Sequence, residues 1–215
     1  MGNFASSHIR NIALLGHGGC GKTSLAEALL FISGTTSRLG SVDEQTSMLD
    51  YEPEEHSRGG SVATSLAWIE HDGHKLNLLD TPGDQNFIYD SLNALRGADV
   101  AVVVVSAPDG IEVQTELVFN EAVSLGLPRA IFINKMDRDR ADSVACLKEV
   151  EETLGVRPVA LQVPIGRESN FEGVISLFQR KALIYKRDGS GGYEKTDIPR
   201  ELIDEVDAAY EVLTE

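Results

Sequence analysis

The sequence predicts an α/β protein with a mostly parallel, doubly wound sheet and helices on both faces. Three observations support this fold class. Short β-branched runs bounded by turn residues indicate buried parallel strands at 9–15, 75–79, 100–105 and 130–134. Helical patterns alternate with these runs, and the connections contain glycine and proline. Alternation of this kind is typical of a doubly wound sheet.

Composition restricts the class of protein further. Of the 215 residues, 42% are hydrophobic, which excludes a disordered chain. The formal charge of −15 disfavours direct sequence-specific binding of nucleic acid. Two cysteines cannot form a disulfide framework or a zinc site and indicate a reducing compartment. Gly2 and Ser6 fit the loose myristoylation pattern, but no second membrane signal accompanies them. We therefore expect a cytoplasmic protein without a membrane partner.

Each expected element has a local signal. Helices are expected at 22–33, 84–95, 112–125 and 139–154, where apolar residues recur at helical spacing or a helix stop follows. The alternating run 62–71 and the Asp72-Gly73 step predict a hairpin with the strand 75–79. The tail departs from this alternation: we expect a strand at 158–163, an amphipathic segment through Tyr185, a hairpin tip at 188–192 and a helix from Pro199. The predicted division is a nucleotide-binding core, 1–156, and a partial α+β insertion, 157–215.

A glycine-rich run between the first strand and its helix carries the strongest motif. It matches G-x-x-x-x-G-K-[ST], in which backbone N–H groups and a helix N-terminus surround phosphates. Lys22 would neutralise the β- and γ-phosphates, and the Thr23 hydroxyl would bind Mg²⁺. The side chains of His17 and Cys20 have no expected chemical role. The residues expected to surround the phosphates are His17, Gly18, Gly19, Cys20, Gly21, Lys22, Thr23 and Ser24.

Two further motifs follow strand ends downstream. Asp80 can hold Mg²⁺ through water, and Gly83 can offer its N–H to a γ-phosphate. In Asn134-Lys135-Met136-Asp137, the Asp137 carboxylate can accept from guanine N1–H and the 2-amino group, while Asn134 ties the loop to the phosphate loop and Lys135 covers a ring face. The alternative is a charged loop in which Asp137 or Asp139 caps the next helix. Three motifs in this order predict GTP or GDP as the ligand.

On these motifs the chain resembles the translational GTPases, and within them the elongation factor G family. The resemblance covers essentially the whole chain and includes the stretches 109–137 and 163–173, the latter resembling the start of that family's G′ insertion. It implies a P-loop GTP-binding fold, GTP hydrolysis with Mg²⁺, and the ribosome as partner, bound mainly through other domains. The family's last strand, last helix and guanine-contacting Ser-Ala loop lie after the insertion, so we expect this chain to be an N-terminal part of a larger factor.

Three departures from the family pattern indicate a divergent paralogue. Asp84 stands where the family has a histidine that positions the attacking water, and it can orient water or simply cap the helix that follows. Ser61 replaces a threonine that binds Mg²⁺ and γ-phosphate, and Gly19 replaces an aspartate. The expected catalytic residues are therefore Lys22, Gly83 and Asp84, and the expected metal ligands are Thr23, Ser61 and Asp80.

The segment 34–60 has little periodicity, and we expect it to be a mobile switch that orders with GTP and a partner. The leading hypothesis is a ribosome-dependent GTPase acting in translocation. A guanine-nucleotide switch with negligible hydrolysis, or a GTPase of the release-factor or ribosomal-protection type, remains open. An ATPase or nucleotide kinase is disfavoured by the 134–137 motif.

Overall fold

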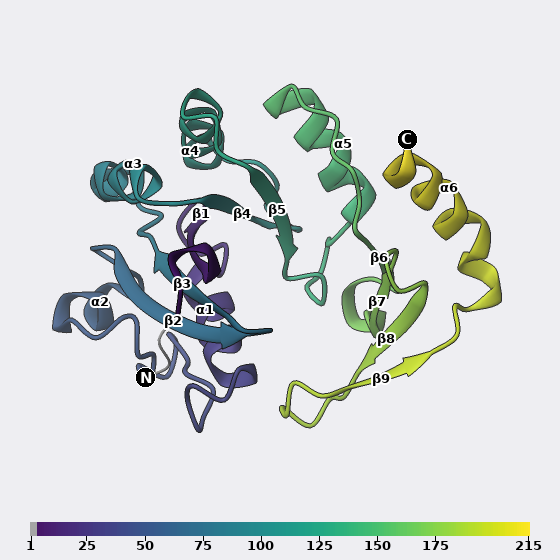
Figure 1. The fold of residues 1–215 in the computed structure, drawn as a ribbon, viewed down its shortest axis with the longest axis horizontal. Helices are drawn as coiled ribbons and strands as arrows, with labels where there is room; N and C mark the ends of the chain where they lie inside the picture. The colour runs from purple at the N-terminus through teal and green to yellow at the C-terminus, as the bar shows by residue number, and fades with distance from the viewer. Residues whose placement is uncertain (1–3) are drawn as a thin grey trace. The chain divides into compact units, whose positions relative to one another are not determined.

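A computed structural model describes residues 4–215, so Gly2, the first residue of the myristoylation pattern, lies outside the described residues. The chain forms two compact units that divide between Asn134 and Lys135. Each unit contains one sheet (Figure 1). The predicted boundary at 156 was drawn from the expected insertion rather than from compactness, and it stays a prediction.

The first unit contains a five-stranded sheet in the order β2-β3-β1-β4-β5. β1, β3, β4 and β5 are parallel, and β2 pairs antiparallel with β3 through the predicted Asp72-Gly73 turn. The predicted α/β fold class is therefore confirmed. The strands are β1 (Ile9–Leu15), β2 (Ser65–His71), β3 (His74–Asp80), β4 (Val100–Ser106) and β5 (Arg129–Asn134).

Helices cover this sheet on both faces. α1 (Lys22–Ile32) packs on β1, β2 and β3, while α3 (Ile88–Arg96) and α4 (Val113–Ser124) contact each other and pack on β1 and β4. The connection from β1 to β3 and the connection from β3 past β1 to β4 run in opposite directions across the sheet. Right-handed crossovers therefore place α1, in the first connection, and α3, in the second, on opposite faces. The core under α1 contains Leu14, Ala26, Leu30, Leu49, Ile69 and Leu78.

The register of β1 and β3 positions the predicted motifs. Leu14 lies opposite Asp80, so the two strands end at the same edge of the sheet. The glycine-rich run follows β1 there, and Asp80 ends β3. The carboxyl edge of a parallel sheet, where strand order reverses, is where ligands bind in folds of this class.

The second unit contains α5 (Ser143–Leu154), a four-stranded antiparallel sheet and α6 (Ile203–Thr214). The strands are β6 (Gln162–Ile165), β7 (Gly173–Ser176), β8 (Lys181–Tyr185) and β9 (Tyr193–Thr196). Val206 of α6 is buried in one core with Val163 of β6, Ile175 of β7 and Leu177, which follows β7. The expected hairpin tip at 188–192 and the helix after Pro199 are present.

Some tail predictions were wrong. The strand expected at 158–163 begins only at Gln162, and the amphipathic segment through Tyr185 is two strands, β7 and β8. α5 begins at Ser143 rather than 139, and neither Asp137 nor Asp139 caps it. Asp142 does so, because its carboxylate accepts hydrogen bonds from Val144 N at 2.9 Å and Ala145 N at 3.0 Å.

Candidate functional site

The glycine-rich run forms a loop that only small residues can build. Gly16, Gly19 and Gly21 have φ values of 137°, 78° and 98°, in a region that L side chains rarely adopt. A Cβ on Gly16 would collide with the Val104 carbonyl oxygen of β4. Gly21 is also the left-handed N-cap of α1, so the loop leads directly into the helix N-terminus. Such a terminus presents backbone N–H groups to an anion.

Lys22 points back over this loop. Its side chain is buried, and Nζ donates to Gly16 O at 3.0 Å and to His17 O at 2.8 Å. Two backbone carbonyls therefore hold the ammonium group at the loop. A phosphate bound at the loop could accept hydrogen bonds from the same ammonium group without a rearrangement of α1.

A chain of side-chain hydrogen bonds begins at Thr23, the next residue of α1. Thr23 Oγ1 lies 3.2 Å from Ser61 Oγ, and Ser61 Oγ donates to Asp50 Oδ1 at 2.6 Å. The structure thus brings together Thr23 and Ser61, two of the expected metal ligands, and adds Asp50, which sequence analysis missed. Burial raises the pKa of Asp50, repulsion from Glu55 and Glu27 adds to the rise, and the Ser61 hydroxyl opposes it.

Asp80, the third expected metal ligand, is completely buried. Neither of its carboxylate oxygens has a hydrogen-bond partner of ordinary geometry within residues 4–215. Burial raises its pKa from 3.8 to about 7, although the nearby Thr23 hydroxyl and Lys22 ammonium lower it. A buried carboxylate that lacks partners marks a place where a cation fits.

The oxygen donors around Asp80 suit Mg²⁺, a hard cation that keeps water and substrate phosphates as ligands. Among residues 4–215 there is no group of three or more His, Cys, Asp or Glu side chains that could hold a metal alone. A magnesium ion fits this donor set if phosphates of a nucleotide complete its coordination. The donors are the hydroxyls of Thr23 and Ser61 and the carboxylates of Asp80 and Asp50.

Two hydrogen bonds fix the loop after Asp80. Thr81 Oγ1 donates to Leu14 O at 2.7 Å, and Ser91 Oγ of α3 donates to Pro82 O at 2.7 Å. They hold Gly83 against the phosphate loop so closely that a Cβ on it would overlap Lys22 Nζ and Gly18 N. Gly83 therefore lies beside Lys22 and the phosphate loop. Donation of its N–H to a γ-phosphate stays a prediction.

Asp84 caps the turn that follows. Its Oδ1 accepts from Asn86 N at 2.8 Å and from Asn86 Nδ2 at 2.8 Å, and a 3-10 turn, Gln85–Phe87, leads into α3. The structure thus contains the capping interaction that was one of two predicted roles. The water-orienting role stays a prediction, and among the described residues the second oxygen, Oδ2, accepts no hydrogen bond that competes with it.

At the end of β5, the Asn134 side chain reaches the phosphate loop. Its Nδ2 donates to Cys20 O at 2.9 Å, as the 134–137 motif predicts. Lys135 and Asp137 belong to the second unit, where Glu168 N donates to Met136 O at 2.9 Å and Lys135 has a φ of 59°. Guanine recognition by these two residues stays a prediction.

His17 has a contact that sequence analysis missed. Its Nε2 lies 3.0 Å from Glu112 Oε1, at the residue that precedes α4. The side chain is buried and connects the phosphate loop to the start of that helix. A role in packing, without chemistry, agrees with its variable position in the motif.

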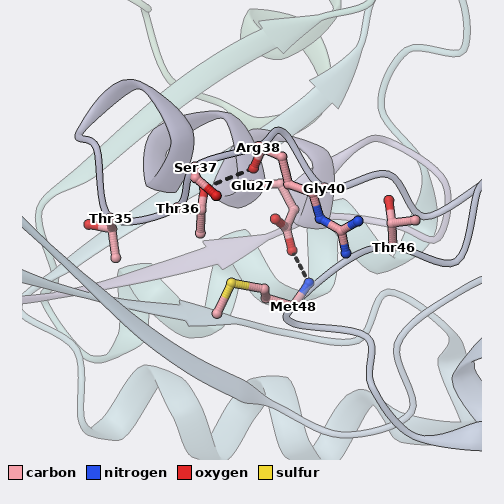
Figure 2. Close-up of a pocket in the computed structure, with 8 residues that line it drawn as sticks. All are labelled: Glu27, Thr35, Thr36, Ser37, Arg38, Gly40, Thr46 and Met48. Carbon is pink, nitrogen blue, oxygen red and sulfur yellow. Dashed lines mark hydrogen bonds between the residues drawn. The ribbon is translucent and has the colours of Figure 1, made fainter.

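The segment expected to be an irregular switch contains one short helix, α2 (Pro53–Arg58). Its signals are local: Pro53 is at the first turn, Glu52 and Glu55 form a capping box, and Gly59 ends the helix with a φ of 67°. A cavity of about 310 Å³ lies between Glu27 of α1 and the first half of this segment (Figure 2). None of the predicted phosphate, metal or guanine ligands lines it. Its lining residues are Glu27, Thr35, Thr36, Ser37, Arg38, Gly40, Thr46 and Met48.

Within residues 4–215, no helix has the length and apolar character needed to cross a membrane. Comparison with known families matches residues 7–210 to the elongation factor Tu GTP binding domain. Elongation factor G of Rhodopseudomonas palustris (strain BisB18) is 35% identical over 207 residues, which are 96% of this chain and 30% of that protein. A crystal structure of a Thermus thermophilus protein superimposes with a TM-score of 0.89 at 36% identity, over 97% of this chain and 31% of the other. The chain therefore spans less than a third of the length of both relatives.

Proposed function

Because the chain belongs to the family of elongation factor Tu GTP-binding domains and is similar to elongation factor G, we propose that it binds and hydrolyses GTP. It would do so with Mg²⁺, as part of a cytoplasmic factor that acts on the ribosome during translocation. The observation that supports this proposal best is the buried carboxylate of Asp80 beside Thr23 and Lys22, whose oxygens accept no hydrogen bond of ordinary geometry within residues 4–215. A cation and a phosphate would satisfy all three groups together.

In this proposal Lys22 and the loop N–H groups hold the β- and γ-phosphates, and the Gly83 N–H donates to a γ-phosphate oxygen. Thr23, Ser61 and Asp80 would hold Mg²⁺, which supplies positive charge beside the same phosphates when bound. A water oxygen attacks the γ-phosphorus as the bond to the β–γ bridging oxygen breaks. Asp84 accepts a hydrogen bond from that water, whose proton ends on inorganic phosphate, and GDP leaves.

Guanine selection is assigned to Asp137, with Lys135 over the base and Asn134 connecting their loop to the phosphate loop. A titration in which GTP and ATP compete for the full chain tests this assignment. We expect GTP to bind about 10² times more tightly than ATP, because the Asp137 carboxylate would accept from two guanine donors that adenine does not present. Equal affinities in the wild-type chain would contradict guanine binding, and Asp137→Ala should remove most of the preference.

The second candidate is a guanine-nucleotide switch with negligible hydrolysis. Asp84 favours it, because this residue stands at the position of the family histidine and its Oδ1 serves as a cap. Single-turnover hydrolysis with and without ribosomes discriminates the two. We expect slow hydrolysis by the protein alone and faster hydrolysis with ribosomes. Absence of a ribosome effect on the full-length protein would remove the translational part of the proposal, whichever translation step it serves.

A further inference from the structure

Glu27 is a buried acid that the proposed mechanism does not use. It lies on α1 one helical turn after Thr23, and its exposed fraction is 0%. Its Oε1 accepts three hydrogen bonds from one short segment: Ser47 Oγ at 2.7 Å, Met48 N at 2.5 Å and Leu49 N at 3.3 Å. Figure 2 shows the carboxylate pointing toward Met48. Removing a carboxylate from water is costly unless such donors compensate, so its position and that of residues 47–49 depend on each other.

Packing reinforces this connection. Leu49 is buried in the core beneath α1, and Ser65 Oγ of β2 donates to Leu49 O at 2.7 Å. Ser47 Oγ in turn accepts a hydrogen bond from Asp50 N at 3.2 Å. The hydroxyl that donates to Glu27 therefore also orients the backbone of Asp50. Residues 47–50, in the segment expected to be irregular, are therefore fixed by hydrogen bonds to α1, to β2 and among themselves.

The hydrogen bonds continue from Asp50 back to α1. Asp50 accepts from Ser61, and Ser61 lies against Thr23, four residues before Glu27. The path begins and ends on the same face of one helix. We propose that Glu27 is a positioning residue that fixes residues 47–50, so that Asp50 and Ser61 meet Thr23 at the site for Mg²⁺ and the γ-phosphate. This inference rests on the proposed GTP-binding function.

Gly40 provides a way to disturb Glu27 without changing a hydrogen-bonding group. A Cβ on Gly40 would overlap Glu27 Oε2, and the φ of Gly40 is not in the left-handed region. Gly40→Ala therefore displaces the carboxylate from its far side. Gly97→Ala is the matched control, because its Cβ would meet only Ala94 O, at 3.7 Å.

The test measures affinity for GTP and for GDP, both with Mg²⁺, in the full chain and in Glu27→Ala, Glu27→Gln, Gly40→Ala and Gly97→Ala. We expect Glu27→Ala and Gly40→Ala to weaken GTP about tenfold, as for the loss of one charge-assisted hydrogen bond. GDP, which lacks the γ-phosphate, should change by less than about threefold, which corresponds to well under one such bond. Glu27→Gln, which keeps an acceptor oxygen, should lie between, and Gly97→Ala should match wild type.

Hydrogen exchange of the nucleotide-free proteins gives a second readout. The amides of Met48 and Leu49 should exchange faster in Glu27→Ala and Gly40→Ala, while β4 in the core keeps its protection. Equal losses for GTP and GDP, or unchanged GTP affinity in Gly40→Ala despite faster exchange, would overturn the positioning role. Failure of wild type to bind either nucleotide would instead contradict the proposed function.

Discussion

The side-chain amide of Asn134, at the end of β5, donates a hydrogen bond of 2.9 Å to the backbone carbonyl of Cys20 in the phosphate loop. The same Nδ2 lies so close to Gly21 that a Cβ on this glycine would overlap it. The last strand of the first unit and the loop after its central strand therefore constrain each other. The contact needs both the amide and the glycine, although 114 positions separate Asn134 from Cys20 in the sequence.

Asn134→Ala should weaken GTP and GDP by about the same factor, roughly tenfold, since it removes one hydrogen bond that shapes a loop used by both nucleotides. Titration calorimetry with each nucleotide measures this. Asn93→Ala, at an exposed asparagine of α3, is the control and should bind both normally. A loss confined to GTP would contradict the interpretation, because it would place Asn134 at the γ-phosphate.

Asp80 predicts a pH dependence of stability in magnesium-free buffer. Its pKa in the folded chain is about 7, above the ordinary 3.8, because burial disfavours the charged form. Between these values the folded chain holds a proton that the unfolded chain has lost. The Asp80 contribution to the free energy of unfolding is therefore largest below about pH 4, falls as pH rises, and levels off above about pH 7.

Asp80→Asn isolates this contribution. At about pH 8 the variant should be more stable than wild type by an amount on the order of 4 kcal/mol or less, and at about pH 4 the two should be nearly equal. Urea unfolding at the two pH values measures the difference. The variant should also lose the stabilisation that Mg²⁺ and nucleotide give to wild type. A constant difference across pH would contradict the prediction, because it would mean that the pKa of Asp80 is the same in the folded and the unfolded chain.

Gly16 and Gly19 separate two reasons for glycine in the phosphate loop. Both have positive φ, but a Cβ on Gly16 would strike the Val104 carbonyl, while one on Gly19 would have no atom within 4 Å. We expect Gly19→Ala to cost about 1–2 kcal/mol of stability through backbone strain, and Gly16→Ala to cost about 1–3 kcal/mol more through overlap. Denaturant unfolding measures both. Equal losses would show that the loop moves away from β4 at little cost.

Much of the first unit could be predicted because its signals are local. The run of valines in β4 is buried on both faces, and the Asp72-Gly73 turn fixes the β2–β3 register, so periodicity and turn chemistry were sufficient there. The position of the glycine-rich loop between β1 and α1 could be predicted because the motif has a fixed spacing within one strand–loop–helix unit. Phosphate and metal binding by this loop and by Asp80 stay predictions.

The roles of Glu27 and Asp50 could not be predicted, because they depend on contacts between segments that no periodicity connects. In the sequence alone, Glu27 cannot be distinguished from any other polar residue of an amphipathic helix. Only the structure shows that Ser47 and Met48 donate hydrogen bonds to it. The same holds for β7 and β8: Gly173 packs so tightly on the Leu183 carbonyl that the strands depend on each other, a relationship absent from either segment alone. Tertiary contacts outweighed local pattern in both regions.

The pair Asp84→Asn and Asp84→Ala separates catalysis from capping. Asparagine keeps an oxygen that can accept from Asn86, so Asp84→Asn should unfold like wild type, while Asp84→Ala should lose about 0.5–2 kcal/mol with the cap. If the carboxylate also orients water, as we propose, both variants should lower single-turnover hydrolysis roughly 10- to 100-fold. This is at or below the low end of general acid–base effects, because Asp84 orients the water and does not take its proton. GTP affinity should change little in either, because the phosphate loop and Lys22 hold the nucleotide. Normal hydrolysis by Asp84→Asn would leave Asp84 with the cap alone, and it would also contradict the candidate function of a nucleotide switch with negligible hydrolysis.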